Sequence, residues 1–167
     1  SFYGICGVYQ MMGQEIHDPE HVEGSIESMP GLGILPVATI LSAEKRTVQS
    51  TFSFLKGNEN CKGYEIHMGR SRLVDGARVR QPSFAVQSGH DLFGDGIASE
   101  DGLVVGTYIH GLLENAALRH ALLHRLAARK GVRLPQSEGA TTVDEAIDAL
   151  AASVREHLDL RAIAAFV

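Results

Sequence analysis

Apolar residues along this chain form short runs over the first two thirds and steps of three or four residues over the last third. The short runs are bounded by glycine, asparagine, aspartate or proline, which is typical of β-strands. They cover residues 2–5, 34–41, 48–55, 63–69, 83–87 and 103–111. After the first run, a glycine-rich bend leads to apolar residues at positions 8, 9, 11 and 12, which predict the buried side of a helix.

Two further helices are predicted in the last third. The first carries a leucine at every fourth position and ends at Gly131, which can adopt the left-handed conformation of a helix C-terminus. Its stripe consists of Leu118, Leu122 and Leu126. The second helix continues an apolar stripe from Ile147 to Leu158 behind Thr142, a capping residue. Strands and helices in this order predict an α/β sheet protein, and the length fits one domain over 1–167.

Composition and charge exclude several classes of protein. Apolar residues make up 44% and charged residues 21% of the chain, which is ordinary for a globular domain that buries a core. The net charge of −5 argues against a nucleic-acid partner, since phosphate-binding surfaces normally carry a basic excess. No run approaches the roughly 18 consecutive apolar residues of a membrane span, and a signal-peptide pattern is absent. We therefore expect a cytoplasmic protein that binds neither nucleic acid nor membrane.

The stretch Gly4-Ile5-Cys6-Gly7 lies where the first strand is expected to turn into a helix. In a nucleophile elbow, a reactive side chain occupies a strained turn between strand and helix, and small neighbours let the backbones pack closely. The helix N-terminus favours the thiolate of Cys6, which is the reactive form, and the amide of Gly7 would face a developing oxyanion. The alternative is an ordinary buried thiol, which is the state that we expect for Cys61.

A thiol nucleophile needs a base, which must come from elsewhere in the chain. His110 ends an apolar run and precedes Gly111, which places it at the carboxyl edge of the sheet, where active sites of open α/β sheets lie. His67 also ends a strand and is the second candidate, although either residue could be a histidine held in the core. The histidines and acids of the polar loop 17–23 match no zinc spacing, and we expect no metal site.

Five segments in order along the chain carry a family resemblance. They read GICGVYQMMG, DPEHVEG, GLGILPV, GYEIHMG and GTYIHGLLEN. Together they resemble the glutamine amidotransferase domain of the cobyric acid synthase family. The resemblance implies a class I, triad-type, flavodoxin-like fold with an open, mostly parallel sheet flanked by helices. It also implies that this chain is the C-terminal portion of the family's domain, without the strands and the glycine-bearing oxyanion loop that precede the cysteine there.

The resemblance implies a function as well. Glutamine is hydrolysed to ammonia, which an N-terminal synthetase domain uses, with ATP and Mg²⁺, to amidate the carboxylates of a corrinoid, adenosylcobyrinic acid a,c-diamide. The glutaminase domain itself needs no cofactor. Cys6 matches the family's nucleophile and His110 its base. The family's glutamine pocket lies around the helix that carries Tyr9 and Gln10 and around the segment that carries His67.

Two positions of the motif differ from the wider pattern. Many class I glutaminases carry a glutamate two positions after the histidine, where this chain has Leu112 and the cobyric acid synthase family also lacks the glutamate. Glu65 and Glu114 are candidates to orient His110 in its place. The family reads GICGGYQ where this chain has Val8, and a β-branched side chain needs space where strand and helix approach closely.

Val8 and the missing oxyanion loop keep other functions open. One alternative is a catalytically silent glutaminase-like module that serves as a structural or docking unit. Another is the glutaminase part of a related amidotransferase, either cobyrinic acid a,c-diamide synthase or a cell-wall amidotransferase. A different cysteine hydrolase would explain Cys6 and His110 but would leave the GYEIHMG and DPEHVEG segments unexplained.

Overall fold

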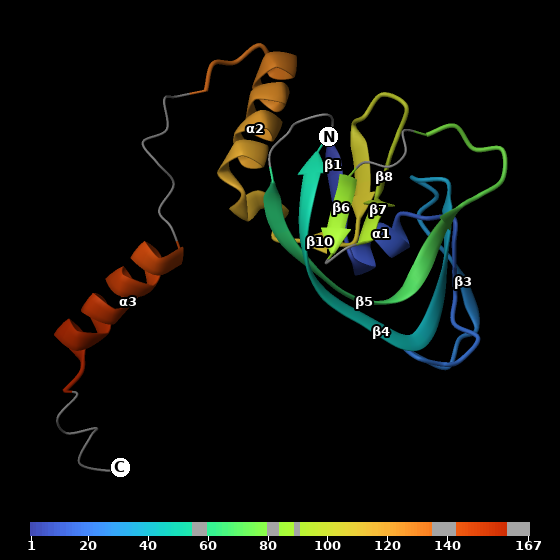
Figure 1. The fold of residues 1–167 in the computed structure, drawn as a ribbon, viewed down its shortest axis with the longest axis horizontal. Coiled ribbons are helices and arrows are strands. Elements are labelled where there is room, and N and C mark those ends of the chain that lie inside the picture. Colours follow the sequence, from blue (N-terminus) through green and yellow to red (C-terminus); the bar gives the residue numbers. More distant parts are fainter. Residues whose placement is uncertain (55–59, 80–83, 89–90, 135–142, 160–167) are drawn as a thin grey trace. The chain divides into compact units, whose positions relative to one another are not determined.

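The computed structural model describes residues 1–54, 60–79, 84–88, 91–134 and 143–159. The chain divides into two compact units, Ser1–Gly131 and Val132–Val167 (Figure 1). The first unit holds all of the candidate site residues and includes helix α2 (Ala116–Lys130), while the second contains helix α3 (Val143–His157). The expected capping residue Thr142 lies outside the described residues. Across the described ranges, no helix is both long enough and apolar enough to span a membrane.

Cys6 directly follows a strand of the smaller of the two sheets that the described residues form. Strand β1 (Phe2–Ile5) pairs in parallel with β9 (Val104–Thr107), and β8 (Ile97–Ala98) pairs antiparallel to the other side of β9. Helix α1 (Gly7–Met11) follows β1 after one intervening residue, Cys6. The predicted order of strand, tight turn and helix is therefore confirmed.

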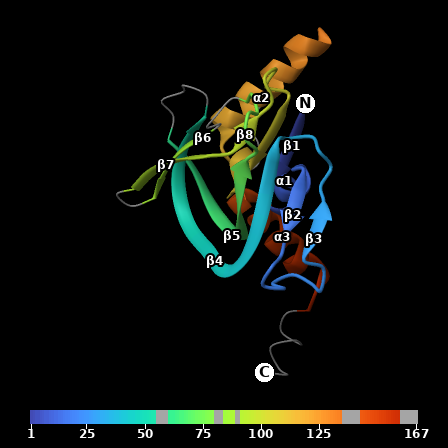
Figure 2. The same ribbon diagram turned by 90° about the vertical axis from the view of Figure 1, so that its right-hand side faces the viewer.

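The larger sheet is built on a long hairpin of β4 (Val37–Phe54) and β5 (Cys61–Leu73), which pair antiparallel. Their register shifts between Ile40 and Lys45, an irregularity that bends a strand, and both strands curve strongly in Figures 1 and 2. The other strands of this sheet are β2 (Glu15–His17), β3 (Ser28–Pro30), β6 (Phe84–Ser88), β7 (Asp91–Asp95) and β10 (Ile109–His110).

Strand pairing differs in part from the mostly parallel sheet that we expected. Among the described strands, only the pairs β1–β9 and β2–β4 are parallel, and the remaining pairs are antiparallel. The reason is local, because the described residues between β4 and β7 form no helix, and parallel pairing of such neighbours needs a crossover. The expected α/β class of sheets with flanking helices is confirmed.

The apolar run 103–111 predicts one strand, but it forms two. Strand β9 ends at Thr107 and β10 begins at Ile109, so the chain leaves the smaller sheet at Tyr108 and enters the larger one. This corner delivers His110 to β5, where it pairs with Tyr64.

Two clusters of buried side chains stabilise the first unit. In one cluster, Phe84 and Ile109 of the sheets pack against two leucines of α2. These are Leu118 and Leu122, which confirms that the predicted leucine stripe faces the core. The other packs the buried side of α1 beneath the corner between β9 and β10. The core therefore lies directly under the elements that carry Cys6 and His110.

Candidate active site

Cys6 occupies a strained turn between β1 and α1. Its backbone has φ 55° and ψ −118°, a conformation that residues other than glycine rarely adopt. The Cys6 N–H donates to the carbonyl of Thr107 at 2.9 Å, and the Gln10 N–H donates to the Cys6 carbonyl at 3.1 Å. A Cβ atom on Gly4 would meet the sulfur of Met12 and would lie 3.2 Å from the backbone nitrogen of Tyr9, so glycine allows β1 and α1 to approach closely here. This is the backbone geometry of a nucleophile elbow.

The sulfur of Cys6 faces β5. Its thiol lies 3.5 Å from the Ile66 carbonyl, to which it donates a hydrogen bond. A Cβ atom on Gly7 would meet no atom within 4 Å, so the space beside the Gly7 Cα, at the start of α1, is open. Val8 is 40% exposed, and its branched side chain therefore points away from the contact between strand and helix. The elbow therefore accommodates a valine at this position.

His110 reaches the same stretch of β5 from the corner. Its ring stacks on that of Tyr64, with the centroids 5.0 Å apart and an interplanar angle of 9°. Cys6 and His110 thus meet β5 at positions 66 and 64. The Nε2 atom of His110 is buried and has no hydrogen-bond partner, and none of the described contacts joins it to Cys6. Because a buried polar atom without a partner is costly, Nε2 is available for a ligand or a reacting group.

Three residues that the sequence assigned to the glutamine pocket converge on Tyr108. They are Tyr9, Gln10 and His67. The Gln10 side-chain nitrogen donates to the Tyr108 hydroxyl at 3.3 Å. Tyr9 packs edge-on against the Tyr108 ring, with the ring centroids 5.2 Å apart, and His67 stacks on the same ring with the centroids 3.8 Å apart. Nothing in the apolar pattern singled out Tyr108, although it stands inside the GTYIHG segment. It ties α1 to β5 and is a structural residue of the candidate site.

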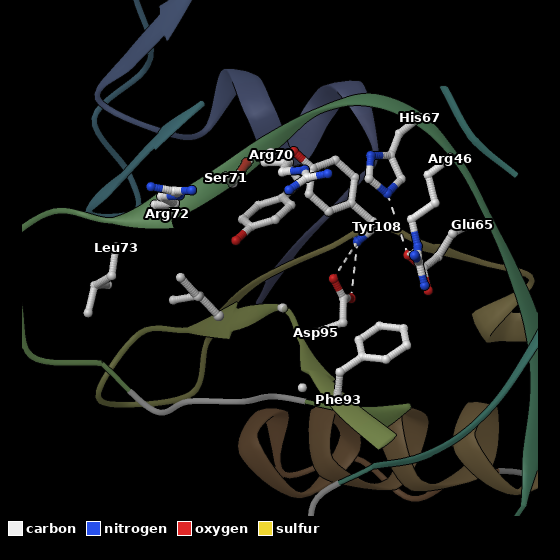
Figure 3. Close-up of a pocket in the computed structure, with 14 residues that line it drawn as sticks. Arg46, Glu65, His67, Arg70, Ser71, Arg72, Leu73, Phe93, Asp95 and Tyr108 are labelled. Atoms are coloured by element: carbon white, nitrogen blue, oxygen red, sulfur yellow. Dashed lines mark hydrogen bonds and ion pairs between the residues drawn. The ribbon is translucent and has the colours of Figure 1, made fainter. Parts of the chain in front are cut away.

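Tyr108 also lines an open pocket of about 500 Å³ (Figure 3). Its wall includes two carboxylates, Glu65 and Asp95, and three arginines on the β4–β5 hairpin. In the part of the chain that the structure describes, neither Cys6 nor His110 lines this pocket. The pocket is therefore a neighbour of the candidate catalytic pair rather than its immediate surroundings.

Glu65 is buried in that wall between cationic and polar partners. Its carboxylate accepts a hydrogen bond from Arg46 at 2.7 Å, and His67 Nε2 and the Ser50 hydroxyl each lie 3.5 Å away. Burial alone would raise the pKa of the Glu65 carboxyl, but the hydrogen bonds and charges of His67 and Arg46 outweigh it and hold the pKa below its ordinary value. The sequence pattern did not indicate the role of Arg46, because it lies on a different strand.

Glu114, the other candidate to orient His110, lies in a short 3₁₀ helix (Leu112–Glu114) that follows Gly111. Its carboxylate lies 3.6 Å from the position that a Cβ atom on Gly111 would take. Within the described ranges, neither Glu65 nor Glu114 makes a hydrogen bond to His110. The arrangement therefore assigns no third member to the Cys6–His110 pair.

The polar loop after β2 is organised by one aspartate. Asp18 is buried and accepts the backbone N–H groups of Val22, Glu23 and Gly24 at 2.7 to 3.3 Å. These hydrogen bonds hold the pKa of the Asp18 carboxyl below its ordinary value. Over the residues that are described, no group of three or more histidine, cysteine or acidic side chains could hold a metal ion.

Comparison with known proteins finds clear relatives of this chain. Residues 1–118 match the family model of the CobB/CobQ-like glutamine amidotransferase domain. The chain is 45% identical to a cobyric acid synthase of Phocaeicola vulgatus, over 94% of this chain and 30% of that protein. It is 42% identical to a cobyric acid synthase of Moorella thermoacetica, over 98% of this chain and 34% of that protein. The chain spans about a third of the length of the curated relatives it matches.

Proposed function

The chain belongs to the family of CobB/CobQ-like glutamine amidotransferase domains, and we propose that it hydrolyses glutamine with Cys6 as the nucleophile and His110 as the base. The ammonia serves the ATP-dependent amidation of carboxylates on adenosylcobyrinic acid a,c-diamide, in the synthesis of cobyric acid. The observation that carries the proposal is the strained backbone of Cys6, with a positive φ, at a junction of strand and helix. Strain of this kind clusters at active sites, where the surrounding structure maintains it.

Hydrolysis begins with attack of the Cys6 thiolate on the side-chain carboxamide carbon of glutamine. A C–S bond forms, and the carbonyl oxygen takes the negative charge of the tetrahedral intermediate. Gly7 donates its N–H to this oxygen, because the first amide of a helix has no acceptor within the helix. The open space beside Gly7 leaves room for the carboxamide group.

His110 moves protons in both halves of the reaction. Its ring accepts the thiol proton of Cys6 and passes it to the leaving nitrogen as the C–N bond breaks, so that ammonia departs and a thioester remains. The ring then takes a proton from the water that attacks the thioester and returns it to the sulfur as glutamate leaves. Glutamine and water thus become glutamate and ammonia. We assign these transfers to Nε2, the buried ring atom without a partner.

Glutamine binds, in this proposal, between α1 and the GYEIHMG segment of β5. The Cys6 sulfur already faces the Ile66 carbonyl there, and the Gln10 side chain spans to the Met68 carbonyl at 2.9 Å. We assign Tyr9, Gln10 and His67 to the wall of this site because Tyr108 holds all three together.

ATP and Mg²⁺ belong to a partner synthetase domain on the N-terminal side, and the corrinoid binds there. The glutaminase part needs no cofactor of its own, because its thiol and imidazole supply the nucleophile and the base. The length of the relatives, about three times that of this chain, supports such a division of labour. We propose that the reaction takes place in the cytoplasm, where ATP is available to the synthetase domain.

Selective labelling of Cys6 tests the proposal. A glutamine-analogue chloroketone is expected to alkylate Cys6 faster than Cys61, and glutamine is expected to protect Cys6. Cys61 is the internal control because it is buried at the start of β5. Glutamate release by the chain and by its Cys6→Ala variant is measured in parallel. Equal labelling of the two cysteines, or glutamate release that survives Cys6→Ala, contradicts the proposal.

A catalytically silent docking module is the second candidate, and one observation favours it. The Cys6 thiol donates its hydrogen bond to the Ile66 carbonyl rather than to His110. A silent module predicts labelling of Cys6 without protection by glutamine, and no glutamate release. The glutaminase part of cobyrinic acid a,c-diamide synthase or of a cell-wall amidotransferase would release glutamate equally, and the identity of the amidated acceptor distinguishes these from cobyric acid synthesis.

A further inference from the structure

The corner between β9 and β10 leaves backbone groups outside both sheet ladders. The ladder of the smaller sheet ends with the pair Ile5 and Thr107, and the ladder of the larger sheet begins with Ile109 and Glu65. Tyr108 lies between them and is buried. Because a buried N–H group needs a hydrogen-bond acceptor, the corner depends on side chains to supply what the ladders do not.

Two side chains supply these acceptors. Asp95, the last residue of β7, accepts the Tyr108 N–H at 3.2 Å (Figure 3). The same carboxylate also accepts a hydrogen bond from the hydroxyl of Thr107. The Thr107 hydroxyl oxygen in turn accepts the N–H of Ile109 at 3.0 Å. A carboxylate can only accept, so the Thr107 hydroxyl must donate to Asp95 and keeps its lone pairs for Ile109.

Thr107 also holds the elbow. It is fully buried, and its carbonyl accepts the N–H of Cys6 at 2.9 Å. One residue therefore fixes Cys6 through its backbone and fixes the residue that precedes His110 through its side chain, while Asp95 fixes that side chain. We propose that Asp95 and Thr107 are positioning residues that set the placement of His110 relative to Cys6. This inference rests on the proposed glutamine hydrolysis by that pair.

The turn after Asp95 also supports a positioning role for this residue. Gly96 has φ 75°, and a Cβ atom there would lie 2.6 Å from the carbonyl oxygen of Gly106 on β9. Only glycine permits this approach, which brings the Asp95 carboxylate against the corner. The carboxylate is therefore held by a backbone built for close contact with β9.

The test compares Asp95→Asn with a matched control, Asp101→Asn. Asp101 also accepts a hydroxyl and a backbone N–H, from Ser99 and Leu103, but it lies in an exposed turn before β9. The measurements are kcat and KM for glutamate release and the pH profile of Cys6 alkylation by iodoacetamide. Asp95→Asn keeps the shape but replaces one acceptor by a donor. It is expected to lower kcat by about 10- to 100-fold, to change KM less than about threefold, and to alter the alkylation profile.

A second pair of variants keeps the test decisive if Asp95→Asn does not fold. Thr107→Val keeps the shape of the side chain and removes the hydroxyl, whereas Thr107→Ser keeps the hydroxyl. The valine variant is expected to repeat the loss, and the serine variant is expected to retain most of kcat. Folded Asp95→Asn and Thr107→Val variants with an unchanged kcat and alkylation profile would overturn the proposal. Equal losses in both Thr107 variants, or failure of both Asp95→Asn and Thr107→Val to fold, would assign these residues to stability and overturn it too.

Failure of the proposed function gives a different result. If the unaltered chain releases no glutamate, glutamine hydrolysis by this chain is contradicted, yet the alkylation profile still reports the placement of Cys6 and His110. His110→Asn then serves as the reference that shows which part of the profile the imidazole contributes. A profile that changes alike in Asp95→Asn and His110→Asn supports positioning, and any other profile overturns it.

Discussion

Two neighbouring polar regions of the first unit each bury one carboxylate, and the groups that hydrogen-bond to the carboxylate differ between them. In the charged cluster, formed by Arg46, Glu65 and His67, the carboxylate of Glu65 is held by cationic side chains. In the corner, formed by residues 107–109 and Asp95, the carboxylate of Asp95 is held by a hydroxyl and backbone N–H groups, which are neutral donors. The two regions share burial but differ in the charge of the partners.

The difference appears in the direction of the pKa shifts. Burial raises the pKa of the Asp95 carboxyl, the hydrogen bonds from Thr107 and Tyr108 offset this only in part, and the negative charge of Glu65 raises it further. For Glu65, the hydrogen bonds and charges of His67 and Arg46 outweigh burial, and its pKa is lowered. Burial thus pushes both groups in one direction, and the charge of the partners decides the outcome.

The largest expected effect is on the rate of glutamate release, which should respond to a change beside the corner but not to one in the charged cluster. His110→Asn, at the residue that directly follows the corner, is expected to lower glutamate release by about 10²- to 10⁴-fold, because asparagine can hydrogen-bond but cannot carry a proton between sulfur and nitrogen. Arg46→Met, in the charged cluster, is the control and is expected to change the rate by less than about threefold. The measurement is steady-state glutamate release, and a loss below tenfold in His110→Asn argues against its role as the base.

The next effect separates the regions by stability. Arg46→Met removes the closest donor to Glu65 and is expected to lower the free energy of unfolding by about 1 to 2 kcal/mol at pH 7, a value reduced because Arg46 is half-exposed. Arg72→Met, at an exposed arginine of β5, is the matched control and is expected to cost less than about 0.5 kcal/mol. Urea denaturation measures both, and equal losses would mean that the Arg46–Glu65 contact contributes nothing specific.

The pH dependence of stability should differ in sign between the two carboxylates. A lowered pKa of Glu65 means that its ionised form stabilises the fold above the ordinary value of 4.5, and that this contribution is lost as the pH falls through the folded-state value. A raised pKa of Asp95 means that its ionisation opposes folding, and that this cost disappears as the pH falls towards its ordinary value of 3.8.

Urea denaturation of Glu65→Gln and Asp95→Asn between about pH 3.5 and 7 checks these signs. The loss of stability caused by Glu65→Gln should shrink as the pH falls, whereas the loss caused by Asp95→Asn should grow. Each change is expected to be about 1 kcal/mol. Parallel profiles for the two variants would show that the partners do not distinguish the two carboxylates.

The smallest effect concerns Val8, which lies outside both regions on the exposed side of α1. Val8→Gly restores the residue of the family motif. It is expected to change glutamate release by less than about twofold and to lower the free energy of unfolding by about 0.5 kcal/mol, because glycine is a poorer helix former. A gain in glutamate release of more than tenfold would show instead that the valine obstructs the elbow.

The elbow could be predicted from sequence because its cause is local. Gly4 and Gly7 lie on either side of the cysteine in the sequence. Gly4 contacts Met12, which follows it in the same strand–turn–helix unit. The corner could not be predicted, because the apolar run 103–111 has no turn residue at Tyr108. The break is made by Asp95, which is 13 residues earlier in the chain.

The buried side of α1 shows the same limit. Positions 8, 9, 11 and 12 are all apolar, and the pattern predicts that all four are buried. Tyr9 and Met12 are buried, whereas Val8 and Met11 are 40% and 49% exposed. The helix is only five residues long, so its orientation is set by the sheet on which it packs rather than by its own apolar pattern. The contact between Arg46 and Glu65 could not be predicted from sequence either, because the two residues meet only when β4 pairs with β5.

The stack of Tyr64 on His110 has an optical consequence. The chain contains no tryptophan and four tyrosines, so tyrosine emission is not masked by a stronger fluorophore. Tyr64 is 45% exposed, and its ring lies flat against the imidazole that we assign as the base. A positive charge on that imidazole acts directly on the π-system of the phenol. We therefore expect the emission of Tyr64, one of the four tyrosines, to respond to a charge on the His110 ring.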